Sequence, residues 1–150
     1  MTDIVDSATR SRMMAGIKSH NTKPELIIRS LLHRKGFRFR LYVKELPGKP
    51  DIVLPKYHAV IFIHGCFWHG HENCRLFKLP GTRPEFWQEK IFRNRSNDTR
   101  AVHLLRDLNW RVCIIWECKI RASKKDLTHM ADIISDFLKG TDPFLELRET

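Results

Sequence analysis

The sequence VIFIHGCFWHGHENC, residues 60–74, runs from a β-branched apolar segment directly into histidines, cysteines and bulky aromatic side chains. Short apolar runs rich in Val, Ile and Phe are typical of buried strands. Functional side chains gather in the loops that such rigid elements hold in place. This stretch therefore predicts a buried strand whose end delivers a loop into a functional site.

Two strands are predicted to form a hairpin at the start of this stretch. Residues 51–54 and 57–63 are apolar and rich in β-branched side chains, and Pro55 and Lys56 mark a tight connection between them. Asp51 would then open one strand and His64 would end the next. We therefore expect these two side chains to converge.

A helix and a further strand are predicted before the hairpin. The sequence TKPE at residues 22–25 is typical of a capping box with Pro at the first helical position, and Gly36 follows the expected helix end near Lys35. Residues 37–43 alternate apolar and basic side chains, which predicts a half-buried strand with a cationic face. The apolar positions of the helix are expected on one face: Leu26, Ile27, Leu31 and Leu32.

The rest of the chain predicts three helices and one strand. Residues 84–108 are expected to form a long helix, residues 111–116 a buried strand, and residues 126–139 a closing amphipathic helix. A short basic helix is expected within residues 7–19. The order α, β, β, β, α, β, α predicts a single α/β domain over residues 1–150, with a mixed sheet flanked by helices.

The composition indicates a soluble protein with a polyanionic partner. The chain carries a net charge of +10, with 11 Lys and Arg against 4 Asp and Glu in residues 1–49 alone. The N-terminal third is therefore expected to contact phosphates, with residues 1–20 as a DNA-contacting segment, although a basic surface that serves only solubility would have the same charge. There is no apolar stretch of the roughly 20 residues that a membrane span needs and no apolar signal region, which favours the cytoplasm.

Three cysteines and one histidine form a candidate zinc site. Cys66, His71 and Cys74 lie in one loop, and Cys118 follows the predicted strand at residues 111–116. A Cys3His set suits tetrahedral structural Zn²⁺ and leaves no open position for catalysis. Free buried cysteines remain the alternative, whereas disulfides are disfavoured without a sign of export. Cys113, within the strand, is expected to be a core thiol.

A carboxylate and two histidines near the strand ends form a candidate catalytic site. Asp51 offers the hard oxygen ligands that Mg²⁺ prefers, and His64 or His69 could deprotonate water or orient a phosphate. Each residue also has a structural explanation. Asp51 after a proline is often a turn residue, His64 can end a strand, and Glu25 can pair with Thr22 in the capping box.

Adjacent aromatic side chains suggest contact with nucleic acid. Phe67 and Trp68 are neighbours in a loop, so both cannot point into the same core, and Trp87 lies near the start of the long basic helix. Apolar side chains that wedge between base pairs recognise distorted DNA. The alternative is that all three are ordinary core aromatics.

Motifs spread over most of the chain resemble those of the very short patch repair (Vsr) DNA mismatch endonucleases. The resemblance implies a fold like that of type II restriction endonucleases. It also implies a Mg²⁺-dependent nick in double-stranded DNA, 5′ to the thymine of a T:G mismatch that arises from deamination of 5-methylcytosine. The matching features are ATRS at residues 8–11, Met14, PGKPD at residues 47–51, HGCFWH at residues 64–69, FW at residues 86–87 and WEC at residues 116–118.

The resemblance also implies roles in hydrolysis. Asp51 corresponds to the metal-binding acid. Ile63 stands where the main-chain carbonyl also contacts metal and where the family pattern has Thr. His69 corresponds to a general base assisted by Glu25, and His64 to a residue that contacts the scissile phosphate.

The remaining implied roles concern zinc, mismatch recognition and partners. Phe67, Trp68 and Trp87 correspond to a wedge that enters the major groove, and Met14 approaches from the minor groove. Cys74 lies one residue later than in the family pattern. The implied partners are T:G mismatched DNA and mismatch-repair proteins such as MutL, for a monomer that acts at the bacterial nucleoid. The ligands of the structural zinc are Cys66, His71, Cys74 and Cys118.

Two other functions fit the same residues. A zinc-stabilised module could bind distorted duplex without cutting it. An ordinary restriction nuclease would cut both strands of matched DNA.

Overall fold

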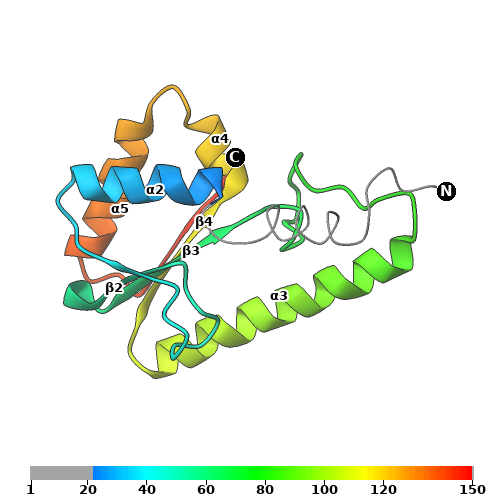
Figure 1. Ribbon diagram of the computed structural model, residues 1–150, viewed down its shortest axis with the longest axis horizontal. Helices are drawn as coiled ribbons and strands as arrows, with labels where there is room; N and C mark the ends of the chain where they lie inside the picture. Colours follow the sequence, from blue (N-terminus) through cyan, green and yellow to red (C-terminus); the bar gives the residue numbers. More distant parts are fainter. Residues whose placement is uncertain (1–21, 150) are drawn as a thin grey trace, which may run out of the picture.

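A mixed sheet runs through the middle of the structure, with helices on both of its faces (Figure 1). The computed structural model describes residues 22–149, so the helix predicted within residues 7–19 and Met14 lie outside the described residues. The strands lie side by side in the order β1 (Arg40–Leu41), β2 (Ile52–Leu54), β3 (Ala59–His64), β4 (Arg111–Trp116) and β5 (Phe144–Leu147).

The direction of the strands changes at β3. β1, β2 and β3 pair antiparallel, whereas β3, β4 and β5 pair parallel. The short helix η1 (Pro55–Tyr57) turns the chain between β2 and β3, which confirms the predicted hairpin. α3 (Pro84–Asp107) joins the parallel strands β3 and β4, as a crossover connection must. Both strands therefore end at the same edge of the sheet, where His64 pairs with Trp116.

Helices cover the two faces of the sheet unequally. α2 (Lys23–Arg34) and α5 (Leu127–Lys139) lie on one face, and α3 crosses the other and extends beyond the sheet (Figure 1). α4 (Glu117–Ala122) begins directly after β4. This arrangement confirms the predicted α/β class. Within residues 22–149, none of the helices has both the length and the apolar character of a membrane span.

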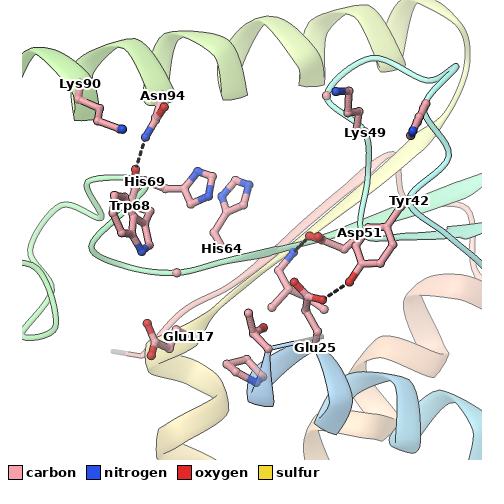
Figure 2. A pocket seen from close by; sticks show the side chains of 16 residues that line it. Glu25, Tyr42, Lys49, Asp51, His64, Trp68, His69, Lys90, Asn94 and Glu117 are labelled. Carbon is pink, nitrogen blue, oxygen red and sulfur yellow. Dashed lines mark hydrogen bonds between the residues drawn. The ribbon is translucent and has the colours of Figure 1, made fainter. Parts of the chain in front are cut away.

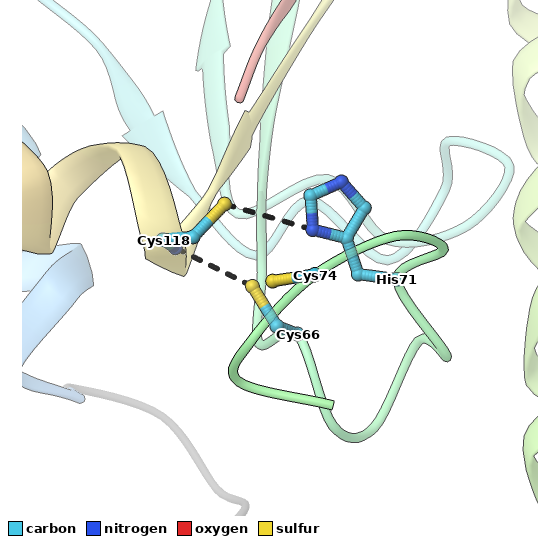
Figure 3. A group of neighbouring side chains, drawn as sticks. All are labelled: Cys66, His71, Cys74 and Cys118. Atoms are coloured by element: carbon cyan, nitrogen blue, oxygen red, sulfur yellow. Dashed lines mark hydrogen bonds between the residues drawn. The ribbon is translucent and has the colours of Figure 1, made fainter. Parts of the chain in front are cut away.

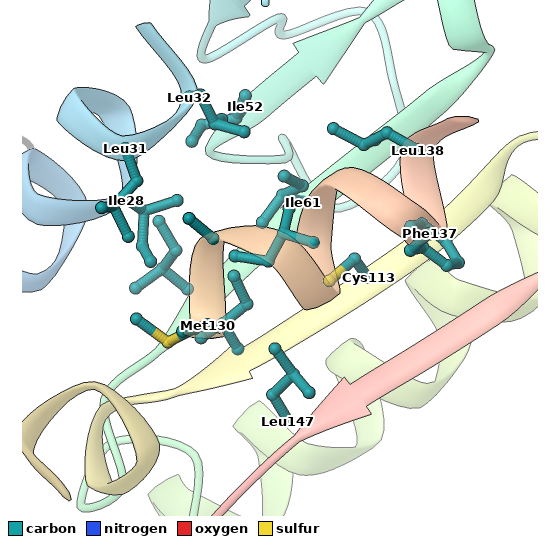
Figure 4. Packing of buried hydrophobic residues seen from close by; sticks show 14 of the residues in the cluster. Ile28, Leu31, Leu32, Ile52, Ile61, Cys113, Met130, Phe137, Leu138 and Leu147 are labelled. Atoms are coloured by element: carbon teal, nitrogen blue, oxygen red, sulfur yellow. The ribbon is translucent and has the colours of Figure 1, made fainter. Parts of the chain in front are cut away.

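Two hydrophobic clusters hold these layers together, one on each face. The larger one packs α2 and α5 against the sheet, and many of its side chains are fully buried (Figure 4). The smaller one packs α3 against the other face, and it includes two cysteines of the zinc candidate, Cys66 and Cys118. The core of the larger cluster is formed by Ile28, Leu31, Leu32, Ile52, Ile61, Cys113, Ile115, Met130, Ile134 and Leu138.

The predicted apolar face of α2 is wrong at one position. Leu26 is 49% exposed, whereas Ile28 is fully buried beside Leu31 and Leu32. The helix begins at Lys23 rather than at Pro24, and the side chain of Thr22 makes no capping hydrogen bond. Residues 25, 28, 31 and 32 share one face at helical spacing, so the buried stripe includes Glu25 instead of Leu26.

The strand predicted at residues 37–43 is much shorter than expected. Only Arg40 and Leu41 pair with β2, and both are exposed. Tyr42 adopts a positive φ of 52°, which bends the chain out of the sheet directly after the pair. α4 and β5 were not predicted, since one is a single short helix and the other a four-residue edge strand with only one buried side chain.

Candidate active site and metal centre

A cavity of about 780 Å³ opens at the end of β3, between the start of α2 and the middle of α3 (Figure 2). The structure brings four predicted catalytic residues to its wall, although they come from three separate parts of the chain. Two lysines from the loop between β1 and β2 and one from α3 surround these groups and make the cavity attractive to anions. The predicted residues are Glu25, Asp51, His64 and His69, and the lysines are Lys44, Lys49 and Lys90.

Asp51 is held against the backbone of β3. Its Oδ2 accepts a hydrogen bond of 2.7 Å from the N–H of Ile63. Burial and, to a smaller extent, the charge of Glu25 raise the pKa of the Asp51 carboxyl to about 7, against the opposing effect of this hydrogen bond. A bound cation would remove this penalty, so the site fits a divalent metal.

The backbone of Ile63 is suited to supply a second oxygen. In a strand, the N–H and C=O of one residue point toward the same neighbour. Because the Ile63 N–H points toward Asp51, its carbonyl lies on the same side of β3. A backbone ligand does not depend on the side chain, so isoleucine is compatible with this role.

Glu25 belongs to the same acidic group. It lies in the first turn of α2, is only 6% exposed, and accepts hydrogen bonds from Arg29 at 3.1 Å and from the hydroxyl of Tyr42. The carboxylate is therefore turned into the cavity beside Asp51 (Figure 2). The predicted capping box with Thr22 does not form through the threonine side chain.

The two histidines lie face to face on the other side of the cavity. Their ring centroids are 3.9 Å apart and the planes differ by 5°. Burial lowers the pKa of His64 well below its ordinary value, and the charges of His69 and His71 lower it further. His64 is therefore a neutral imidazole at physiological pH.

His69 has a carboxylate partner that the sequence did not indicate. Its Nδ1 lies 2.5 Å from Oδ2 of Asp98, on α3. This contact fixes the orientation of the ring and favours the tautomer with the proton on Nδ1. The other ring nitrogen is then a proton acceptor, as general base catalysis requires.

Phe67 and Trp68 of the loop after β3 form a cluster with Trp87 of α3, outside both hydrophobic cores. Phe67 and Trp87 have ring centroids 5.6 Å apart, and Trp68 and Trp87 are separated by 5.8 Å. All three are half-buried. Asn94 donates a hydrogen bond of 2.9 Å to the carbonyl of Trp68 and ties this loop to α3. The interpretation of these residues as ordinary core aromatics does not fit this position.

The four candidate zinc ligands meet at one point (Figure 3). Their ligand atoms all lie within 4.8 Å of one another. The distance from Cys118 Sγ to His71 Nδ1 is 3.6 Å. A tetrahedral zinc with bonds of about 2.3 Å to sulfur and about 2.0–2.1 Å to nitrogen has S to N edges of roughly 3.6 Å. The donor set and this spacing fit a closed zinc site.

The remaining cysteine behaves as expected for a core residue. Cys113 is fully buried in the larger hydrophobic cluster, and burial raises the pKa of its thiol to about 12. Burial also raises the pKa of Cys66. For Cys66, unlike Cys113, a metal would compensate the buried thiolate.

Sequence reasoning missed the contributions of α3. Asn94 and Asp98 contact Trp68 and His69 respectively. The two residues are four apart, so they project from the same helix face. Residues 93–100 are polar throughout, so no local pattern in the sequence distinguishes these two positions from their neighbours.

Comparison with known proteins gives consistent matches. Residues 2–75 match the family model for DNA mismatch endonuclease Vsr. The DNA mismatch endonuclease Vsr of Escherichia coli (strain K12) is 49% identical over 125 residues, which are 83% of this chain and 80% of that protein. The type II nicking enzyme V.XorIIP of Xanthomonas oryzae pv. oryzae is 48% identical over 80% of this chain and 88% of its own length.

A third relative has a similar level of sequence identity to this chain. The type II nicking enzyme V.NmeAIP of Neisseria meningitidis is 44% identical over 81% of this chain and 86% of its own length. Identity at this level covers most of each relative, and it agrees with the motifs that the sequence presents. The chain belongs to the DNA mismatch endonuclease Vsr family.

Proposed function

We propose that this chain is a DNA mismatch endonuclease that nicks double-stranded DNA 5′ to the thymine of a T:G mismatch. Family membership supports the activity. The observation that carries the proposal is the shared cavity, in which a buried carboxylate faces a pair of histidines among lysines. Such a cavity can accept a phosphate between a cation site and a general base.

Asp51 and the main-chain carbonyl of Ile63 would hold Mg²⁺. When bound there, the cation would neutralise charge that develops on the phosphate during hydrolysis. Glu25, beside Asp51, adds negative charge to the same wall and strengthens its attraction for a cation. A cation held there would explain why the structure keeps two largely buried carboxyl groups side by side.

His69 would accept the proton of the attacking water. Asp98 holds its Nδ1 and stabilises the imidazolium that results. His64 is neutral and stacked against it, so it can donate a hydrogen bond to the scissile phosphate without adding a charge. Lys49 and Lys90, on opposite sides of the cavity, would contact neighbouring phosphates.

Phe67, Trp68 and Trp87 would recognise the mismatch as a wedge. Their half-buried rings pack together, so the cluster is rigid before DNA arrives. Insertion of apolar rings unstacks a base step, and a mismatched step resists this less than a matched one. Met14, outside the described residues, would approach from the minor groove.

Structural zinc would hold the loop that carries the wedge and His69. Its ligands would be Cys66, His71 and Cys74 from this loop and Cys118 from α4. Four protein ligands leave no position for water, so zinc would support the site without taking part in hydrolysis. We further propose that the protein acts as a monomer beside the bacterial nucleoid, with mismatch-repair proteins such as MutL as partners.

A strand-resolved nicking assay tests the function. A duplex with one T:G mismatch is labelled on each strand in turn and incubated with the protein and Mg²⁺, and a matched T:A duplex serves as control. We expect one product, from the thymine strand of the mismatched duplex. Binding without a nick would favour the non-cleaving DNA-binding module, and cleavage of both strands of the control would favour an ordinary restriction nuclease.

A further inference from the structure

The end of β5 and the residues after it contact the loop that contains the zinc ligands. Arg148 donates hydrogen bonds from Nη2 to the carbonyls of Glu72 at 2.8 Å and Asn73 at 3.1 Å. These two residues connect the ligands His71 and Cys74. Asn73 has a positive φ of 53°, a conformation that needs support from its surroundings. Arg148 therefore fixes the loop between two ligands.

Backbone N–H groups point at two of the cysteine sulfurs. The N–H of Glu149 lies 3.4 Å from Sγ of Cys118, and the N–H of Cys118 lies 3.3 Å from Sγ of Cys66. Hydrogen bonds of this kind stabilise a thiolate relative to a thiol. The carboxylate of Glu149 also accepts a hydrogen bond of 3.0 Å from Nε of Arg75, the residue after Cys74.

β5 also orients the histidine ligand through a tryptophan. Oε2 of Glu146 accepts a hydrogen bond of 2.6 Å from Nε1 of Trp116. The Trp116 ring stacks on His71, with centroids 3.8 Å apart and planes 4° from parallel. The same ring meets His64 edge-on at 5.0 Å. Trp116 thus contacts both a zinc ligand and a histidine of the candidate active site.

We propose that Glu146, Arg148 and Glu149 form a clasp that retains zinc and couples the zinc site to the catalytic histidines. The inference rests on the zinc site proposed above. Groups that hydrogen-bond metal ligands from outside orient them and tune their affinity, and their loss weakens metal binding by about 10–100-fold. The members of this clasp are positioning residues, because none of them would touch the metal or the DNA.

Zinc release tests the arginine of the clasp. Full-length protein is mixed with excess chelator, and the rate of zinc loss is followed with a colour indicator. We expect Arg148→Ala to lose zinc about 10–100-fold faster than wild type. Arg148→Lys should release it at an intermediate rate, because a flexible ammonium keeps the charge and the donors but lacks the fixed planar geometry of the guanidinium. Arg34→Ala is the matched control, since Arg34 is an exposed arginine whose hydrogen bond goes to Ser30.

Glu149 allows the backbone hydrogen bond to be tested separately. Glu149→Pro removes the N–H that points at Cys118, whereas Glu149→Ala keeps it and removes only the carboxylate. With Co²⁺ in place of zinc, the sulfur-to-metal charge-transfer bands report on the thiolates. We expect these bands to shift in Glu149→Pro and to stay unchanged in Glu149→Ala.

The coupling to the histidines has its own measurement. Glu146→Leu removes the acceptor for Trp116, and Glu146→Gln keeps an oxygen there. We expect Glu146→Leu to lower kcat for nicking several-fold with little change in KM, and Glu146→Gln to restore it. Folding of each variant is checked by circular dichroism, so that general unfolding is recognised.

The zinc-release results distinguish a failure of the clasp from a failure of the zinc site on which it rests. Wild-type protein that holds zinc, together with Arg148→Ala that releases it at the wild-type rate, would overturn the clasp alone. Wild-type protein that binds no zinc would overturn the zinc site and the clasp together. Neither result depends on whether the protein nicks DNA.

Discussion

His64 and His69 stack face to face with ring centroids 3.9 Å apart, although one ends β3 and the other lies in the loop beyond it. Two imidazoles so close cannot both carry a proton without repulsion, and the charge of His69 lowers the pKa of His64. The carboxylate of Asp98 is available to His69 at 2.5 Å. His64 is thus the neutral member of the pair, and Asp98 orients the ring of His69.

Asp98→Asn is expected to slow hydrolysis without weakening DNA binding. The amide can turn its NH2 group toward Nδ1 of His69 and favour the wrong tautomer, so the nicking rate should fall by about 100-fold or more. Single-turnover nicking at saturating protein measures this rate. Asp107→Asn, at the exposed end of the same helix, is the control. A variant at Asp98 with the wild-type rate would show that His69 acts without this partner.

Asp51→Asn is expected to abolish nicking and yet to stabilise the protein in Mg²⁺-free buffer. Burial raises the pKa of Asp51 from 3.8 to about 7, so the stability that the neutral carboxyl contributes is present below pH 4 and is lost as the pH rises through 7. Asparagine keeps the acceptor for the Ile63 N–H without the charge. Urea unfolding at pH 8 should show a gain on the order of 2 kcal/mol after allowance for solvent exposure.

The same gain must disappear near pH 4, where wild-type Asp51 is largely protonated. Equal or lower stability of Asp51→Asn at pH 8 would mean that the carboxylate is adequately solvated in the folded protein. The cavity would then offer less reason to bind a cation.

Trp68→Ala is expected to weaken binding to a T:G duplex more than binding to a matched duplex. Loss of a ring that stacks with bases costs about 1–3 kcal/mol, which corresponds to roughly 5–150-fold in affinity. Fluorescence anisotropy with both duplexes measures the difference. Phe92→Ala, which removes a 70% exposed ring from α3, should leave the preference for the mismatch intact. Equal weakening on both duplexes by Trp68→Ala would argue against a wedge.

Cys118→Ser and Cys113→Ser form a matched pair for the zinc site. Both cysteines are fully buried, but only Cys118 belongs to the Cys3His cluster. Elemental analysis should find about one zinc per chain in wild type and in Cys113→Ser, and a marked loss in Cys118→Ser. Full zinc content in a folded Cys118→Ser protein would remove Cys118 from the ligand set.

The sequence was sufficient for the elements whose pattern is local. The hairpin of β2 and β3, the long α3, β4 and α5 all have clear periodicity, and the structure confirms them. The parts that failed depend on tertiary context. Residues 37–43 alternate like a strand, but Tyr42 turns away after two paired residues. Leu26 is apolar but faces solvent, because packing against the sheet selects the face of α2 that contains Ile28.

In the candidate site, too, some residues could be predicted from the sequence and others depend on tertiary contacts. Asp51, His64 and His69 could be proposed because they flank one predicted strand end and because the motifs resemble a family. The residues that support the site could not be proposed in this way. Asp98 is 29 residues from its partner His69, and Glu146 is 30 residues from its partner Trp116. Neither pair has a sequence pattern of its own. The crossover helix and the parallel alignment of β5 bring them together only in the folded chain.

The most direct test compares nicking and binding on the same T:G duplex for Asp51→Ala and His69→Ala. If Asp51 holds the catalytic cation and His69 accepts the proton, both variants should lose nicking by several orders of magnitude and bind the duplex within a few-fold of wild type. Nicking that persists in either variant, or an equal loss of nicking and binding, would contradict the assignment of these two residues to catalysis.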